Sequence, residues 1–199
     1  MRDAHENAEK MWNAVLEAGK EFGLMVIAPA HHRRIAAGIL SWGQDLDHET
    51  SPFQVNLSYQ VPRNKEADYI GKEALEKQRA IIDEGKAPFK MKMVGIIFGG
   101  KNIIDYAPDF WLIEDMEGNE MGFVTSPWWS PELETNIGLA WVPWDSSEVG
   151  TKLQVKLPDE YSESSGVPVA GEVVDIPFRE SVNPNKREVQ AAKGLDFAD

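Results

Sequence analysis

The sequence predicts an α+β fold, in which a helical N-terminal part precedes a small six-stranded antiparallel β-barrel. The spacing of apolar residues is the first observation behind this prediction, because helical spacing recurs in segments before Gly85 and changes to alternation beyond Pro88. Turn-forming Gly, Pro, Asn and Asp residues divide the alternating part into short runs, which is the second observation. The expected strands carry Phe89, Met91 and Met93; Phe110 and Leu112; Met121 and Phe123; Ile137 and Leu139; Leu153 and Val155; and Val173 and Ile176.

The first forty residues predict a helix, a strand and a second helix. Residues 3–22 carry apolar side chains at helical spacing, with Asp3 as the N-cap and Gly23 as the stop, so this helix is expected to bury one face. The apolar run Leu24–Ala28 predicts a short strand, and Arg33–Leu40 predicts the second helix. A parallel strand of this kind normally lies inside a sheet covered on both sides. We therefore expect the remnant of a larger central α/β domain.

Four regions are expected along the chain. A third helix, charged over most of its surface, is predicted to open near Tyr69 and to end near Gly85. The polar composition after Phe178 predicts a loose tail. The regions are the end of the central α/β domain (1–50), an extended connector with the third helix (51–86), the antiparallel β-barrel (87–180) and the polar tail (181–199).

The composition excludes several classes of partner and site. The 33 acidic and 20 basic residues give a formal charge of −13, which disfavours binding to nucleic acid and to anionic membranes. The chain has no cysteine, so it has no disulfide, zinc–thiolate site or thiol nucleophile. No apolar run approaches the roughly 20 residues of a membrane-spanning helix, and the N-terminus lacks the apolar core of a signal peptide. These features predict a cytoplasmic protein.

The aromatic segment Gly122–Val142 is the most informative stretch of the sequence. It predicts two strands joined by a stiff corner that contains two prolines. Trp111 and Trp141 fall inside strand patterns, so they are expected to fill the barrel core. Trp128 and Trp129 fall at the expected turn, where burial and a role facing a ligand or a neighbouring domain are equally open interpretations.

Two polar groups have both a functional and a structural interpretation. The run from His31 to Arg34 could bind an anionic substrate, but a solvated helix start is the favoured interpretation of His31 and His32. The run from Asp45 to Glu49 has metal-ligand residue types without the spacing of a metal site, so a hydrated turn is favoured, and Asp45 is the candidate to cap or hold that loop. No nucleophile elbow or phosphate-binding loop is present.

Four segments of the sequence carry a family pattern when they are taken in order. They are Arg34–Gly38 with Trp42–Asp45 and Pro52; Tyr69–Leu75; Gly122–Ser126 with Ser130, Pro131 and Ile137–Val142; and Gly150–Leu153 with Val173–Phe178. Together they resemble the C-terminal half of the tetrahydrofolate-dependent aminomethyltransferase family, that is, the glycine cleavage T-protein and its demethylase relatives. The resemblance implies a C-terminal β-barrel after a central α/β region. It also implies tetrahydrofolate held between domains, and transfer of a one-carbon unit from a heteroatom donor to N5 of that cofactor.

The residues that match the family motifs set the candidate site. Arg34 matches the second arginine of the family's Arg-Asp-x-x-Arg-x-Glu run, whose first arginine and glutamate are Ala30 and Ala36 here. The aspartate near the folate N5 and the Tyr-x-Gly-Glu-x-Gly segment of the family are not found in the sequence. The resemblance therefore implies no catalytic residue and no metal ligand in this chain, and no turnover by the chain alone. The candidate folate-binding residues are Arg34, Trp42, Asp45, Trp128 and Trp129.

The departures from the T-protein pattern favour a demethylase branch. The stretch from Asp3 to Pro52 looks most like the tetrahydrofolate-dependent O-demethylases that act on methoxylated aromatic acids, and the sulfoniopropionate demethylases are a second similar branch. The expected partners are folate, a small methylated substrate in the full enzyme and a second copy of the chain. A glycine cleavage T-protein proper, a non-catalytic folate-binding or oligomerisation module, and a truncated reading frame stay open as alternatives.

Overall fold

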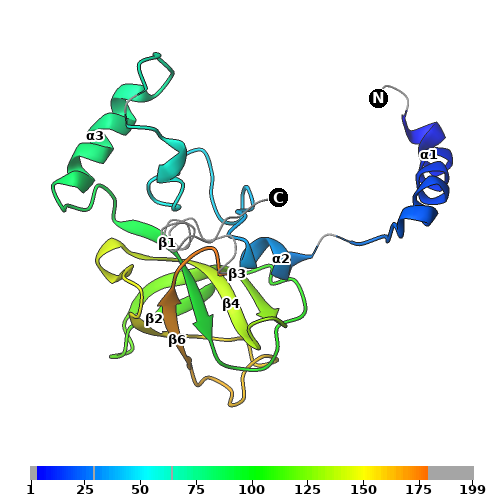
Figure 1. The fold of residues 1–199 in the computed structure, drawn as a ribbon. Helices are drawn as coiled ribbons and strands as arrows, with labels where there is room; N and C mark the ends of the chain where they lie inside the picture. The colour runs from blue at the N-terminus through cyan, green and yellow to red at the C-terminus, as the bar shows by residue number, and fades with distance from the viewer. Residues whose placement is uncertain (1–3, 29, 64, 179–199) are drawn as a thin grey trace, which may run out of the picture. The chain divides into compact units, whose positions relative to one another are not determined.

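The computed structural model describes residues 4–28, 30–63 and 65–178 (Figure 1). The chain divides after Ala30 into two compact units. The predicted N-cap Asp3 and the predicted tail over 181–199 lie outside the described residues. No helix within the described ranges is long and apolar enough to cross a membrane.

The first unit contains the predicted N-terminal helix. This helix is α1 (Ala4–Gly19), which continues into the 3-10 turn η1 (Lys20–Phe22). The stop at Gly23 is confirmed, because Gly23 adopts a left-handed conformation with φ 68° and donates its N–H to the carbonyl of Lys20. The expected buried face is not formed within this unit, where Trp12 and Val15 remain more than half exposed.

The predicted strand over Leu24–Ala28 is wrong. The segment has no strand pairing in the structure, and Met25 and Ile27 are 80% and 67% exposed. A strand is stable only when a neighbour accepts and donates its backbone hydrogen bonds, and no partner strand for this segment lies within the described part of the chain. The apolar run therefore indicates a local preference for the extended conformation, but the segment pairs with no strand in the described part of the chain.

Two further helices belong to the second unit. The helix predicted over Arg33–Leu40 is α2 (His31–Ala36), which ends earlier than expected. Gly38 has φ 69° and donates to the carbonyl of Ile35, while the N–H of Ile39 donates to the carbonyl of Arg34 at 2.7 Å. This pair of hydrogen bonds is a Schellman motif, so Gly38 stops the helix. The third predicted helix is confirmed as α3 (Lys72–Asp83), which follows the short turn η2 (Ser58–Gln60).

Six antiparallel strands form a closed barrel, as predicted (Figure 1). Their order around the barrel is β1-β4-β3-β2-β5-β6, and closure leaves no open sheet edge at the ends of this order. The strands are β1 (Met91–Phe98), β2 (Trp111–Glu114), β3 (Glu120–Ser130), β4 (Thr135–Pro143), β5 (Lys152–Val155) and β6 (Val169–Val174), with the 3-10 turn η3 (Trp144–Ser146) between β4 and β5.

The barrel interior is filled by alternate residues of the strands. In β1, Val94, Ile96 and Phe98 are buried in one cluster, while Met93 and Ile97 belong to another on the outer side. The same alternation in the other strands completes the interior, which contains mainly β-branched side chains. These residues include Ile113, Val124, Ala140, Val142, Leu153, Val155 and Val173.

A second apolar cluster lies on the outer wall of the barrel. Ile35 and Ala36 of α2 pack there with Met93 of β1 and with Ile137 and Leu139 of β4. Both faces of β4 are therefore buried, one in the barrel and one beneath the segment that begins with α2. The outer cluster fixes α2 and the loop after it against the barrel, and this loop carries the candidate site.

The stiff corner predicted within Gly122–Val142, at Pro127 to Pro131, is largely a continuation of strand β3 and not a turn. The two prolines were expected to end one strand, but β3 continues through Trp128 and Trp129, and the turn follows at residues 131–134. The N–H of Trp129 donates to the carbonyl of Ile103 at 2.8 Å, outside the ladder with β4. Alternate residues of a strand direct their nitrogens to the same side, so the nitrogen of Pro127 also points away from β4. The missing N–H of Pro127 therefore breaks no bond with that strand.

The two tryptophans predicted to fill the barrel core have different positions. Trp111 is 5% exposed and packs in the barrel interior, as expected. The prediction for Trp141 is wrong, because its side chain packs with the outer cluster. Its neighbours Ala140 and Val142 point inward, and the alternation of β4 directs Trp141 outward.

Candidate functional site

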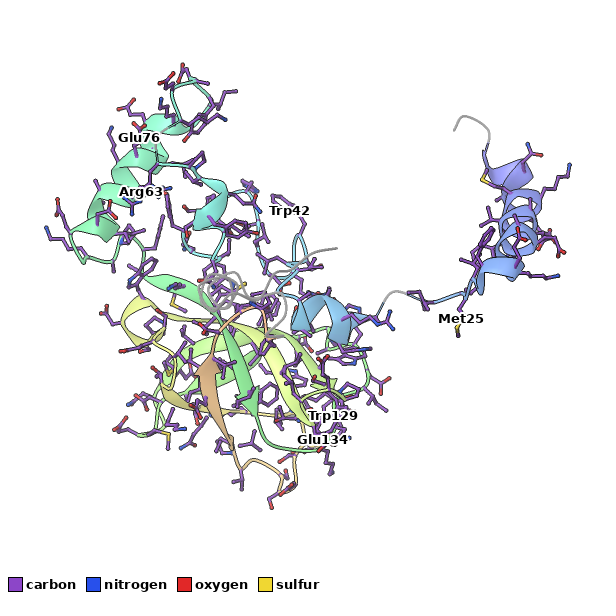
Figure 2. All side chains as sticks on the ribbon, in the orientation of Figure 1. Met25, Trp42, Arg63, Glu76, Trp129 and Glu134 are labelled. Carbon is purple, nitrogen blue, oxygen red and sulfur yellow. The ribbon has the colours of Figure 1, made fainter. Side chains whose placement is uncertain are left out.

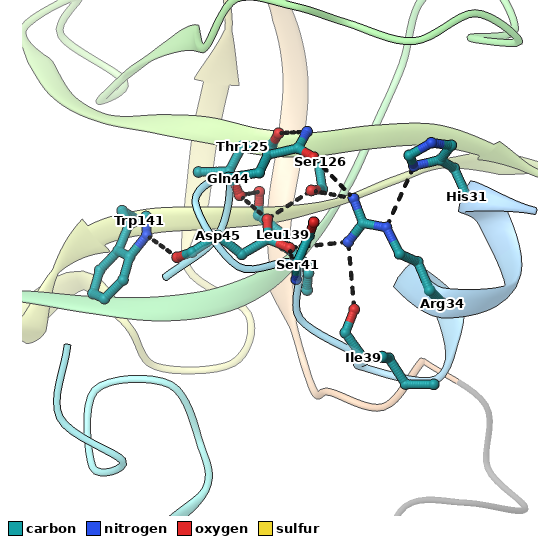
Figure 3. Close-up of polar contacts among 10 residues, drawn as sticks. All are labelled: His31, Arg34, Ile39, Ser41, Gln44, Asp45, Thr125, Ser126, Leu139 and Trp141. Atoms are coloured by element: carbon teal, nitrogen blue, oxygen red, sulfur yellow. Dashed lines mark hydrogen bonds and ion pairs between the residues drawn. The ribbon is translucent and has the colours of Figure 1, made fainter. Parts of the chain in front are cut away.

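The carboxylate of Asp45 is the centre of a hydrogen-bond network between the loop after α2 and strand β3 (Figure 3). The residue is 1% exposed. Its Oδ1 accepts from the hydroxyls of Thr125 and Ser126, each at 2.6 Å. Its Oδ2 accepts from the backbone N–H of Ser41 at 2.7 Å and from Arg34 at 2.9 Å. Four donors therefore satisfy a carboxylate that would otherwise be costly to bury.

The guanidinium of Arg34 closes the network from the side of α2. It forms an ion pair with Asp45 and donates to the hydroxyl of Ser126 at 2.8 Å. Longer bonds of 3.3 Å reach the carbonyl of Ile39 and the side-chain oxygen of Gln44. Ser126 accepts from Arg34 and donates to Asp45, so the three side chains form a closed ring of charge-assisted hydrogen bonds. We call Arg34, Ser41, Asp45, Thr125 and Ser126 the clamp.

The loop that carries Asp45 is shaped by its own sequence and by the barrel. Gly43 has φ 80°, which glycine adopts without strain, and its N–H donates to the carbonyl of Leu46 at 2.8 Å. Gln44 donates to the backbone carbonyl of Thr125 at 2.7 Å. The indole N–H of Trp141 donates to the backbone carbonyl of Asp45 at 3.0 Å, which explains why Trp141 points outward. The loop is therefore held at both its side chains and its backbone.

His31 lies at the start of α2, beside the clamp. Its ring stacks on Trp128 with a centroid distance of 5.1 Å and meets Tyr106 at 5.6 Å. Arg34 donates to its Nδ1 at 3.3 Å. Burial lowers the pKa of His31 from 6.5, the positive charge of Arg34 lowers it further, and Asp45 opposes both effects. His31 is therefore a neutral acceptor near pH 7, and the solvated helix start favoured from the sequence does not describe it.

We expect His31 to titrate below pH 6.5 in the folded protein. Because the folded-state pKa is lowered, the unfolded chain binds the proton more readily, so this residue contributes stability above pH 6.5 that is lost as the pH falls through the folded-state pKa. Histidine ring signals followed by NMR over pH 4–8 measure the midpoint, and a His31→Gln variant assigns the signal. A midpoint at or above 6.5 would contradict the environment described here.

The candidate aromatic residues do not gather at one place. Trp42 is 68% exposed on the loop that the clamp holds. Trp128 and Trp129 are partly buried in β3, and Figure 2 shows Trp42 and Trp129 at separate positions on the second unit. Of the five candidate residues, Arg34 and Asp45 contact each other as an ion pair. Trp42, Trp128 and Trp129 do not form one aromatic cluster, and Trp128 stacks on His31.

An open hollow of about 420 Å³ lies next to the clamp loop. The rings of Phe110 and Phe123 stack at 5.3 Å and line it together with Trp141. Asp47 and Thr50 lie on the loop side. Asp47 accepts from the N–H of Glu49 at 2.9 Å and from Thr50, and these hydrogen bonds lower the pKa of Asp47. The acidic run therefore forms a hydrogen-bonded turn, which is the structure favoured from the sequence.

Sequence reasoning missed the partners of Arg34 and Asp45. Ser41, Thr125 and Ser126 are three of the five clamp residues, but they match no catalytic motif. The available signal was the adjacent polar pair Thr125 and Ser126 inside an apolar strand, since two neighbouring residues of a regular strand point to opposite faces. A bulge between Val124 and Ser126 lets both hydroxyls reach Asp45.

Residues 87–178 match the glycine cleavage T-protein C-terminal barrel domain, and residues 3–65 match the GCVT N-terminal domain. The chain belongs to the glycine cleavage T-protein family. As a family member, it joins one segment from each matched domain through the clamp, because Arg34 and Asp45 lie in the first match and Thr125 and Ser126 in the second.

The chain is similar to aminomethyltransferases of several bacteria. The chain is 35% identical over 154 residues to the aminomethyltransferase of Geobacillus sp. (strain WCH70), covering 76% of this chain and 40% of that protein. It is 28% identical over 177 residues to the one of Chloroherpeton thalassium, covering 88% of this chain and 44% of that protein. The chain thus spans about two fifths of the length of these relatives.

A solved structure has the same fold. The crystal structure of the glycine cleavage system aminomethyltransferase T from Bartonella henselae superposes with a TM-score of 0.59 at 24% identity. The match covers 75% of this chain and 37% of that chain. At this level of identity the likeness concerns the fold alone.

Proposed function

We propose that this chain works as the C-terminal part of a tetrahydrofolate-dependent one-carbon transferase. The reaction moves a methyl or aminomethyl group from a heteroatom donor to N5 of the cofactor. The clamp is the observation that carries the proposal, because it holds a loop of the first matched segment on the barrel of the second. A buried and fully hydrogen-bonded contact of this kind fixes the loop after α2 relative to strand β3, so residues of both can line one binding channel.

The candidate residues take two roles in this proposal. Trp42 presents an exposed ring that can stack on a flat pterin, and Trp128 and Trp129 offer further aromatic surface. Asp45 is buried with its oxygens occupied by donors, so it acts through the loop rather than by touching the ligand. Arg34 acts in the same way, since its guanidinium is bound to Asp45 and Ser126. Both are positioning residues for Trp42.

The chemistry of the reaction divides between the cofactor and the protein. Tetrahydrofolate supplies the nitrogen that accepts the one-carbon unit. The protein has to orient that nitrogen and the donor, and has to supply a proton to the departing heteroatom. The described residues of this chain provide orienting walls, and we assign the proton donor to none of them.

A demethylase is the branch of the family that we propose. Ala36 stands where the T-protein pattern has a glutamate, and it is 4% exposed in the apolar cluster outside the barrel. A glutamate there would bring an unpaired carboxylate into that cluster. Calorimetry separates the two demethylase branches. It measures whether the folate-loaded protein binds a methoxylated aromatic acid or a sulfoniopropionate.

Titration of the purified chain with tetrahydrofolate tests the proposed function. We expect the tryptophan fluorescence to change on binding, and Trp42→Leu to weaken binding by up to about tenfold through the loss of ring stacking. Trp12→Leu is the matched control, because Trp12 is also exposed but lies in the first unit. A flat response of the unchanged chain would favour a non-catalytic module, and equal affinities of both variants would remove Trp42 from the site.

A further inference from the structure

Lys92 is a half-buried cation at the end of the barrel, and no described residue forms an ion pair with it. It is the second residue of β1 and lies on the same side of that strand as Val94, whose side chain is buried inside. Its ammonium group lies over the ring of Trp144, 5.2 Å from the centroid. Burial lowers the pKa of Lys92. Among the residues that the structure describes, none forms an ion pair or hydrogen bond with this ammonium group.

Two hollows meet at Lys92. One has a volume of about 330 Å³ and the other of about 200 Å³, and Asn56, Ser58 and Lys92 line both. Asn56 is fixed in place, since its side-chain amide donates to the carbonyl of Met93 at 2.8 Å. The two hollows therefore adjoin at these three residues, which bring a hydroxyl, an amide and an ammonium group to the place where they meet. We call the two hollows together the Lys92 cleft.

The Lys92 cleft has an excess of positive charge on the side of α3. Arg63, Arg79 and Lys92 line this side, against the single carboxylate of Asp83. That carboxylate is occupied by Arg63, which binds both of its oxygens at 2.6 and 2.8 Å. Arg79 stacks over the ring of Phe53 at 5.1 Å, donates to a backbone carbonyl and shares the field of Asp83 with Arg63, so one carboxylate faces three cations on this side. On the other side, Asp175 is the carboxylate that lines the cleft.

We propose that the Lys92 cleft binds a small oxyanion, a carboxylate or a phosphate, with Lys92 as its charged ligand. A half-buried ammonium group without an ion pair loses hydration that its contact with the Trp144 ring replaces only in part, and an oxyanion would replace the rest. The Ser58 hydroxyl supplies a neutral donor beside it, and Arg79 adds a second positive charge. The cleft shares no residue with the clamp, so this site does not depend on folate binding.

Because the whole chain is acidic, we expect anions to bind in the Lys92 cleft and not generally over the protein surface. The formal net charge of −13 repels anions over most of the surface, so an anion is bound only where cations are concentrated. Screening by salt weakens such an attraction less in a partly buried cleft than on an open surface. The binding of an anion here is therefore expected to persist at moderate chloride concentration.

Calorimetric titration of the full chain with inorganic phosphate and, separately, with citrate tests this proposal. We expect at least one of the two to bind, and Lys92→Met to weaken that binding by about tenfold or more, as the loss of a charge-assisted hydrogen bond requires. Lys90→Met is the matched control, because it removes the same charge from an exposed side chain two residues away. Phosphate binding alone would identify a phosphate site, and citrate binding alone a carboxylate site.

A chemical footprint of the unchanged chain gives a result that does not depend on how the variants fold. Formaldehyde and borohydride methylate deprotonated amines, so a bound anion that stabilises the ammonium form of Lys92 should slow its labelling, measured by peptide mass spectrometry. Exposed lysines such as Lys101 should be labelled at an unchanged rate. The proposal is overturned if neither anion binds, if Lys92→Met binds as tightly as the unchanged chain, or if the anion leaves the labelling of Lys92 unchanged.

Discussion

Replacing Asp45 by alanine is expected to lower the free energy of unfolding of the second unit by about 3–5 kcal/mol. The substitution removes the acceptor for Arg34 and for the hydroxyls of Thr125 and Ser126, all of which lie at the joint between the loop and β3. The guanidinium of Arg34, only 18% exposed, would lose its ion-pair partner. Leaving a partly buried charge without its partner costs more than the pair contributes when it is intact.

Urea unfolding followed by tryptophan fluorescence measures this effect. The matched control is Asp109→Ala, because Asp109 is exposed and the change in composition is the same, and we expect it to stay within about 0.5 kcal/mol of the unchanged chain. Asp45→Asn keeps the shape of the side chain and should give an intermediate loss. A loss below about 1 kcal/mol for Asp45→Ala would show that the clamp does not hold the loop on the barrel.

Replacing Ile96 by alanine is expected to lower the free energy of unfolding by about 2–5 kcal/mol. Ile96 is fully buried in the barrel interior, on a strand that is paired on both sides, with Gly138 of β4 and Val173 of β6 as its neighbours. A closed barrel has no free edge that could move inward to fill the space. The cavity left by the missing atoms therefore adds to the lost burial of apolar surface.

The control for Ile96 is the same substitution at Ile104, which is 65% exposed. We expect Ile104→Ala to change the stability by no more than about 0.5 kcal/mol. Ile96→Val, which removes one methylene group, should cost about 0.5–1.5 kcal/mol. If Ile96→Ala and Ile104→Ala had equal effects in the same urea experiment, the barrel interior would not be the main source of stability.

The parts of the fold that depend on local periodicity could be predicted from the sequence. The helix that became α1 and the six strands are set by apolar spacing and by turn residues, and both are local properties. The strand expected at Leu24–Ala28 failed because a strand also needs a partner, which apolar spacing cannot supply. The turn expected at Pro127 failed because a proline is tolerated in a strand wherever its nitrogen faces away from the ladder.

Arg34 and Asp45 were candidates from the sequence, but the contact between them and with β3 was not predicted. Arg34 and Asp45 were found through motif positions only 11 residues apart, while their partner Ser126 lies 92 residues after Arg34. A contact over that separation depends on the closure of the barrel and on the bulge in β3, which no local pattern reveals. The same is true of Lys92, whose burial follows from the turn that brings Trp144 over it.

Strand β4 is buried on both faces, and this limits how far the chain can be shortened from its N-terminus. A polypeptide starting at residue 87 would contain every strand of the barrel, yet it would expose Met93, Ile137 and Leu139 on the outer wall. Contiguous apolar surface of this kind promotes aggregation. The shortest polypeptide that should stay in solution as a monomer therefore starts near His31. Its helix α2 and the loop that follows cover the apolar outer wall of the barrel.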